Sequence, residues 1–154
     1  MMNLNETVDF YIKSAWHSLT RMYNQLAIQN GFSQAIGYVL IHIEKEGTPA
    51  TKIAPLLGME PTSLSRLLQK MEQLGLIYKK MDRTDKRIVR IFLTDEGNQK
   101  RKLAKQTILE FNEKLAMTIH IEDIAKLITV LKEIRNVVQS EAEQVTNAKL
   151  PENP

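Results

Sequence analysis

One stretch of the sequence places hydrogen-bonding side chains at helical spacing, opposite a stripe of apolar ones. The apolar stripe consists of Leu64, Leu67, Leu68, Met71 and Leu74. The polar side carries Thr62, Ser63, Ser65, Arg66, Gln69, Lys70 and Gln73. Short hydroxyls, Gln and Arg match the edges of base pairs and the oxygens of phosphates, whereas a merely solvated face is usually richer in Glu and Lys. The pattern favours a helix that lies in the major groove of a duplex. Capping and solvation are the alternative for the three hydroxyl residues.

A second group of charged residues follows shortly afterwards, from Asp82 to Arg87. It separates two runs rich in β-branched and aromatic residues, Leu76 to Met81 and Ile88 to Leu93, which is typical of a β-hairpin. Basic side chains mark its tip: Arg83, Lys86 and Arg87. The tip of a two-stranded ribbon is narrow enough to enter a minor groove, where the negative potential favours Arg. A solvated charged loop is the alternative.

The distribution of charge is more informative than its sum. The 154 residues carry a net charge of only +3, but the segment from Arg66 to Arg90 carries +5 and the remainder −2. The positive excess therefore lies in the segment where a surface that faces phosphates would need it.

Helices must position these two groups. Apolar residues at steps of three or four predict a first helix over about 5–30, and Gly31 ends it. A second helix is expected from the N-cap Ser33 to about Glu46, where Gly47 begins a stop signal. The residues that carry the first periodicity are Val8, Tyr11, Ala15, Leu19, Met22 and Leu26.

Two short helices then form a helix-turn-helix, Thr51 to Leu57 and about Pro61 to Leu74. Gly58 permits the tight turn between them, and Pro61 fits a first helical turn, where its missing N–H costs nothing. After the hairpin, Thr94 is a candidate N-cap for a long helix to about Met117. A last helix is expected over about 122–143, followed by a frayed tail from Asn147 to Pro154.

Composition excludes several classes of protein. The chain has no cysteine, so disulfides, thiolate metal sites and cysteine nucleophiles are impossible. It shows no apolar run long enough for a membrane span and no secretory signal, so a cytoplasmic location is expected. His17, His42 and His120 are too scattered to suggest a metal site, and no catalytic motif is visible. Neither a cofactor nor an enzymatic activity is expected.

The order and spacing of these motifs resemble those of the MarR family of bacterial winged helix-turn-helix regulators. The resemblance covers roughly Tyr11 to Val138. It is most specific in the segments Ile53 to Gly58, Pro61 to Leu68, Leu74 to Ile77, Asp85 to Arg87 and Leu93 to Gly97. It implies a mainly α (α+β) fold: a winged helix-turn-helix part over 33–97 with a two- or three-stranded wing sheet, flanked by dimerisation helices over 5–30 and 98–145, all in one domain over 1–154.

The resemblance also assigns roles to residues. It implies that the helix after Gly58 reads the major groove, that Arg87 reaches the minor groove and that Asp85 holds the wing in shape, although a turn former is the alternative for Asp85. Lys86 stands where many members have Arg, so a bidentate contact is not expected there. The full set of DNA-binding candidates is Thr62, Ser63, Ser65, Arg66, Gln69, Lys70, Arg83, Lys86 and Arg87.

A homodimer is the implied assembly, and it agrees with the apolar surface carried by the helices at both ends of the chain. Twofold symmetry would place two reading helices about 34 Å apart on a palindromic DNA site. A small aromatic or amphipathic effector could bind near Trp16, His17, Tyr23, Tyr38 and His42, for which core or interface packing is the alternative. The expected function is that of a DNA-binding transcription repressor. The alternative from another class is a helical module that binds protein.

Overall fold

The computed structural model describes residues 3–147, and their contacts group into two compact units that meet between Leu109 and Glu110. Helix α5 belongs to the first unit by its N-terminal part and to the second by its C-terminal part. The sequence predicts one domain in which the winged helix-turn-helix part ends at Gly97 and dimerisation helices flank it, and this organisation stays a prediction. Of the tail expected to fray, only Asn147 is described, and it is the last residue of a helix.

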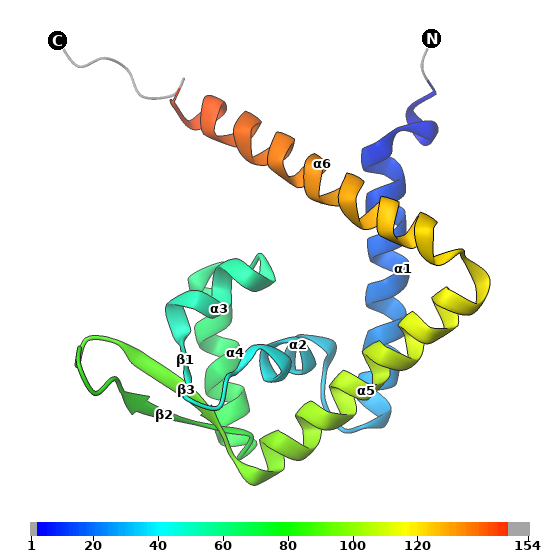
Figure 1. The fold of residues 1–154 in the computed structure, drawn as a ribbon. Helices are drawn as coiled ribbons and strands as arrows, with labels where there is room; N and C mark the ends of the chain where they lie inside the picture. Colours follow the sequence, from blue (N-terminus) through cyan, green and yellow to red (C-terminus); the bar gives the residue numbers. More distant parts are fainter. Residues whose placement is uncertain (1–2, 148–154) are drawn as a thin grey trace, which may run out of the picture. The chain divides into compact units, whose positions relative to one another are not determined.

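The first unit contains most of the helices and one small sheet (Figure 1). Three antiparallel strands are arranged in the order β1-β3-β2, which confirms the predicted wing sheet. The register pairs Ile77 with Leu93 and Met81 with Val89 across the hairpin. In chain order the elements are a 3-10 turn Leu4–Glu6, α1 Val8–Gln29, α2 Gln34–His42, β1 Thr48–Pro49, α3 Ala50–Leu57, α4 Pro61–Gln73, β2 Ile77–Met81, β3 Val89–Leu93 and α5 Asp95–Thr118.

Glycine and serine set the ends of the central helices. The Ser33 hydroxyl accepts a hydrogen bond from the Ile36 N–H at 3.4 Å and caps α2. Gly58, with φ 59°, ends α3, and Gly75, with φ 68°, follows α4. After Gly75, the Leu76 N–H donates back to the Met71 carbonyl at 3.0 Å, which closes α4 tightly before β2 begins.

Helix α2 is shorter than the sequence predicts. It ends at His42 instead of near Glu46, because Ile43 adopts an extended conformation and is buried. The Thr48 hydroxyl holds the following loop: it accepts a hydrogen bond from the Glu44 N–H at 2.9 Å and donates one to the His42 carbonyl at 3.2 Å. The apolar spacing that continued to Ile43 therefore reflected burial of a loop residue and not a further helical turn.

The core of the first unit lies between α2, α3, α4 and the sheet. Its fully buried side chains are Ile36, Val39, Leu40, Ile43, Ile53, Met71 and Ile91. Leu64 and Leu68 on α4 are almost completely buried against this core, so the opposite side of α4 faces outward.

The second unit comprises the end of α5 and the helix α6, Ile121–Asn147. None of the α6 side chains is buried within residues 3–147. Large apolar residues are at least two-fifths exposed along the helix, among them Ile121, Leu127, Ile128, Leu131 and Val138. No helix of the described chain has the length and apolarity that a bilayer crossing requires.

Candidate nucleic-acid interface

The outward face of α4 presents the polar residues that the sequence singled out. Thr62, Ser63, Ser65, Arg66, Gln69 and Lys70 are all exposed. The Ser65 hydroxyl donates to the Pro61 carbonyl at 2.9 Å, so its oxygen is left as an acceptor for an external donor. Hydroxyls lie at the N-terminal end of this face, and Arg66 and Lys70 follow at one-turn spacing.

Thr94 ties the end of α4 to the root of the wing. Its hydroxyl donates to the Gly75 carbonyl at 2.6 Å and accepts from the Gly97 N–H at 3.0 Å, as the predicted N-cap of α5. Its backbone N–H donates to the Leu76 carbonyl at 3.1 Å. The polar helix and the hairpin are therefore held together at one point.

A glycine makes this connection possible. A Cβ added at Gly97 would lie 1.9 Å from the Leu76 carbonyl oxygen, so only glycine lets α5 approach β2 so closely. A second link between α4 and the wing is an ion pair of Glu72 with Lys79 on β2, at 2.7 Å.

Arg87 projects from the tip of the wing. Its side chain is 90% exposed, and its guanidinium makes two hydrogen bonds of 3.1 Å to the two oxygens of Asp85. The Asp85 carboxylate also accepts from the Arg87 backbone N–H at 3.0 Å. These bonds lower the pKa of Asp85 below its usual value and keep it ionised. Arg83 and Lys86 are exposed on the same turn.

The structure adds wing residues that the sequence analysis did not single out. Asp82 is only 7% exposed and accepts hydrogen bonds from Thr84, Asp85 and Arg90. The available signal was an Asp two residues before a Thr in a turn, which is typical of a side chain that bonds the backbone ahead of it. On the same strands, the Lys80 ammonium lies 5.1 Å from the ring centre of Tyr78, which stacks on Phe92.

Three of the five predicted effector residues line one pocket between α1, α2 and α3. These are Trp16, Tyr38 and His42, and the cavity of about 500 Å³ has the size of a small-molecule site. The His42 Nδ1 atom lies 2.7 Å from the Tyr38 carbonyl, and because a carbonyl can only accept, Nδ1 is the donor of this hydrogen bond. The remaining lining residues are Gln34, Ala35, Leu56, Leu57 and Met59.

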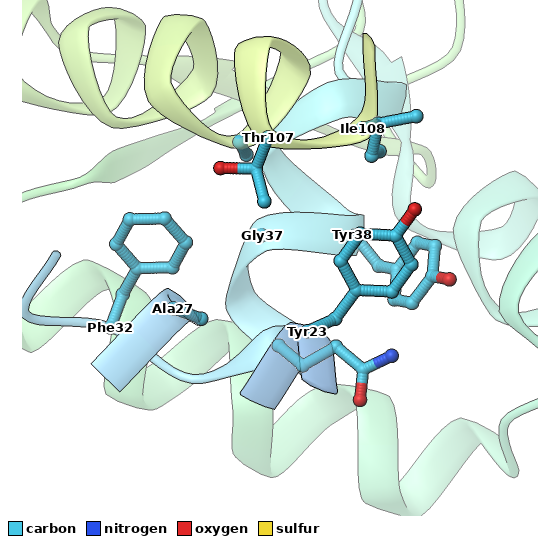
Figure 2. Close-up of a pocket in the computed structure, with 9 residues that line it drawn as sticks. Tyr23, Ala27, Phe32, Gly37, Tyr38, Thr107 and Ile108 are labelled. Carbon is cyan, nitrogen blue, oxygen red and sulfur yellow. The ribbon is translucent and has the colours of Figure 1, made fainter. Parts of the chain in front are cut away.

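Tyr23 lies instead in a smaller pocket between α1, α2 and α5 (Figure 2). The space accessible to water there is about 30 Å³, which is room for one or two water molecules and not for an aromatic ring. Burial, and secondarily the neighbouring Tyr38, raises the pKa of Tyr23, so its hydroxyl stays neutral. His17 lies on the exposed part of α1 and lines neither pocket.

Within residues 3–147 no three His, Asp or Glu side chains come together in a group that could hold a metal ion. The arrangement of exposed polar and basic groups on α4 and the wing suits recognition of a polyanion.

A helix-turn-helix followed by a three-stranded sheet with a basic hairpin defines a winged helix-turn-helix protein. Residues 32–88, which include the helix-turn-helix and most of the wing, match the model of the MarR family. Over this segment the chain is similar to the MarR family.

A curated relative, the HTH-type transcriptional regulator TtmR of Methylorubrum extorquens (strain PA1), is 31% identical over 96 residues. The match covers 62% of this chain and 49% of the relative, so it spans about half the length of that protein.

Solved structures share the fold. A MarR-family transcriptional regulator from Listeria monocytogenes, complexed with a 26mer DNA, is 19% identical, with a TM-score of 0.81 over 96% of this chain and 99% of its own. The S. aureus MepR–DNA complex is 21% identical, with a TM-score of 0.76 over 86% of this chain and 98% of its own. The transcriptional regulator SlyA is 23% identical, with a TM-score of 0.77 over 88% and 96%. These likenesses confirm the predicted fold class.

Proposed function

We propose that this protein is a sequence-specific, double-stranded-DNA-binding transcription regulator that acts as a homodimer and represses its target. Its role is non-catalytic, and binding to chromosomal DNA places it in the cytoplasm. The match of residues 32–88 to the MarR family model and the solved DNA complexes of two proteins with this fold support the proposal.

One observation carries the proposal: the polar face of α4 and the wing arginine are joined through Thr94. Thr62, Ser63 and Arg66 would meet base edges and phosphates of the major groove. Arg87 would leave Asp85 and enter the adjacent minor groove. Because an exposed ion pair contributes little free energy, Arg87 can exchange the Asp85 carboxylate for acceptors on DNA at little cost.

The homodimer is supported by apolar surface that one copy leaves uncovered. Trp16 on α1 is 54% exposed, and Leu127 on α6 is 55% exposed. Apolar exposure repeated along whole helices is unusual for a monomer, and a second copy of the chain would cover it. Analytical ultracentrifugation is expected to give twice the monomer mass, and a stable monomer at micromolar concentration would contradict the proposal.

DNA binding is tested by fluorescence anisotropy on duplexes that the wild-type protein enriches from a random-sequence library. Arg66→Ala and Arg87→Ala are each expected to weaken binding by about 1–3 kcal/mol while the dimer stays folded. Lys126→Ala on α6 removes the same charge from a side chain that is 74% exposed and serves as the matched control. Equal affinities for Arg87→Ala and wild type would contradict the role of the wing.

Salt dependence separates this function from that of a protein-binding module. Contacts to phosphates release counterions, so the affinity for DNA must fall steeply as salt rises. An interface with an apolar centre gives a shallow dependence. Failure to enrich any duplex, together with salt-insensitive binding to a protein partner, would favour the module.

The larger pocket, with Trp16, Tyr38 and His42, is the proposed effector site. Benzoate and its hydroxy derivatives serve as probes in a thermal-shift assay, where a ligand at about 100 times its Kd adds about 2.7 kcal/mol of stability. Trp16→Ala is expected to remove the shift, and His17→Ala, on the same helix but outside the pocket, is expected to keep it. A shift that survives Trp16→Ala would place the ligand elsewhere.

A further inference from the structure

The turn of the wing is built around the buried carboxylate of Asp82. One of its oxygens, Oδ1, accepts hydrogen bonds from the Thr84 N–H at 2.8 Å, the Thr84 hydroxyl at 2.7 Å and the Asp85 N–H at 3.1 Å. The Asp82 backbone N–H donates to the Ile88 carbonyl at 2.9 Å. The bonds from Thr84 and the neighbouring Arg90 hold the pKa of Asp82 far below its usual range. The turn therefore forms around a carboxylate that is ionised at neutral pH.

Arg90 joins this turn to a different part of the fold. Its Nε donates to the second oxygen of Asp82, and another guanidinium nitrogen donates to the Gly47 carbonyl at 2.8 Å. Gly47 lies in the loop between α2 and β1. One side chain thus bonds two acceptors on separate segments from two nitrogens that the planar guanidinium holds at a fixed spacing, whereas a lysine would have to reach both acceptors from a single nitrogen.

The receiving loop is itself fixed. Arg101 on α5 donates to the Ile43 carbonyl at 2.9 Å, and the hydroxyl of Thr48, directly after the loop, bonds the His42 carbonyl and the Glu44 N–H at its start. The strand β1, by contrast, pairs with β3 over only two residues, and Pro49 has no N–H to offer. The side chain of Arg90 therefore supplies a tie between the wing and the body that the short strand does not.

We infer that Arg90 is a positioning residue for DNA recognition: through Asp82 and the Gly47 carbonyl it fixes the direction in which the wing presents Arg87. This inference rests on the proposed DNA-binding function. Two nitrogens of Arg90 are occupied within the protein, and its side chain is only one-third exposed, so it acts through Arg87 and not by its own contact with DNA.

A double-mutant cycle tests the coupling, with full-length protein and a duplex enriched by the wild type from a random library. Arg87→Ala alone is expected to lower affinity about 10- to 100-fold. Arg90→Gln is expected to lower it about fivefold or more in the wild-type background, and less than twofold once Arg87 is already Ala. Arg83→Gln removes the same charge from the turn that Arg90 supports, without removing a bond to Gly47 or Asp82. Arg83→Gln should therefore lower the affinity for the duplex by the same factor in the wild-type and the Arg87→Ala backgrounds.

Equal losses for Arg90→Gln in both backgrounds would overturn the inference, because they would mean that Arg90 meets DNA independently. No loss in the wild-type background would overturn it as well. Arg90→Lys keeps the charge but not the fork, and it replaces Arg90→Gln in the same cycle if thermal unfolding shows that the Gln variant does not fold.

A second measurement needs no DNA and so separates this inference from the proposed function. Amide hydrogen exchange in free protein is expected to be about tenfold faster or more at Asp82, Thr84 and Asp85 in Arg90→Gln, and unchanged in α4. Arg83→Gln should leave these rates alone. Unchanged exchange rates in Arg90→Gln would overturn the inference that Arg90 fixes the wing turn. Failure of the wild-type protein to enrich a duplex would overturn only the DNA-binding role.

Discussion

The substitution Gly97→Ala is expected to separate α5 from the start of β2. The added Cβ would lie 1.9 Å from the Leu76 carbonyl oxygen and 3.0 Å from its carbon, and both atoms are backbone. An ordinary carbon–oxygen contact is about 3.3 Å or more, so the two segments must part by about 1.4 Å. No rotamer change can relieve the overlap, because the obstacle is the main chain.

The magnitude follows from what such a shift would break. Thr94 bonds the Leu76 and Gly75 carbonyls at 3.1 and 2.6 Å, and neither bond survives a displacement of this size. Two lost hydrogen bonds cost about 1 kcal/mol each, and overpacking adds about 1–3 kcal/mol. The better helix propensity of Ala returns about 1 kcal/mol. The net loss in free energy of unfolding is about 2–4 kcal/mol.

Urea unfolding followed by circular dichroism measures this loss, with all variants at one protein concentration because the proposed dimer would link stability to concentration. Gly37→Ala is the matched control: Gly37 is also in a helix, but its added Cβ meets only side chains, the Phe32 ring at 3.1 Å and the Ala104 Cβ at 3.6 Å. We expect the control to change stability by less than about 1 kcal/mol. The midpoint of Gly97→Ala should fall by about 1–2 M urea.

Two results would refute this reasoning. A Gly97→Ala midpoint equal to that of the wild type would mean that α5 can move without cost to the Thr94 bonds. Equal losses in the Gly37 and Gly97 variants would mean that the effect comes from the helix backbone and not from the Leu76 carbonyl.

Three further predictions concern single side chains. Because the pKa of Asp82 is lowered from 3.8, its ionised form stabilises the fold above about pH 4, and this stabilisation is lost as the pH falls through the folded-state pKa. Asp82→Asn should therefore reduce the loss of unfolding free energy at acid pH, measured by urea unfolding at a series of pH values. The same acid loss in wild type and variant would exclude Asp82 as its source. Arg101→Gln should lower the free energy of unfolding by about 1–3 kcal/mol through loss of its bond to the Ile43 carbonyl, whereas exposed Lys102→Gln should change it by less than about 0.5 kcal/mol. Thr94→Val should lower the free energy of unfolding, measured by thermal denaturation, by about 1–2 kcal/mol. Thr107→Val is the control, because the Thr107 hydroxyl bonds a carbonyl of its own helix. An equal loss in the two variants would contradict the linking role of Thr94.

The central motif could be predicted because its signals are local. Gly58 needs positive φ and Pro61 needs a first helical turn, and both requirements act within a few residues of the chain. The polar face of α4 followed from periodicity alone. Its contact with DNA stays a prediction, as do the roles of Arg87 and Asp85.

Long-range polar bonds could not be predicted from such patterns. The first turns of α5 are very polar. In the structure Lys100 donates to the Asn30 carbonyl at 2.9 Å and Arg101 to the Ile43 carbonyl, so each caps the end of an earlier helix. The partners are separated by 70 and 58 residues, and the acceptors are main-chain atoms that leave no trace in the residue types. The same holds for Arg90 and Gly47.

Gly97 and Gly37 place different demands on the evolution of this chain. The nearest neighbour of an added Cβ at Gly37 is the Phe32 ring, so a smaller residue at 32 can make room for a side chain at 37, and these two positions should change together among homologues. The neighbour of Gly97 is a carbonyl group that every residue type possesses. No replacement elsewhere can compensate, so lineages that keep this junction of helix and hairpin should retain glycine at 97 however far the rest of their sequences diverge.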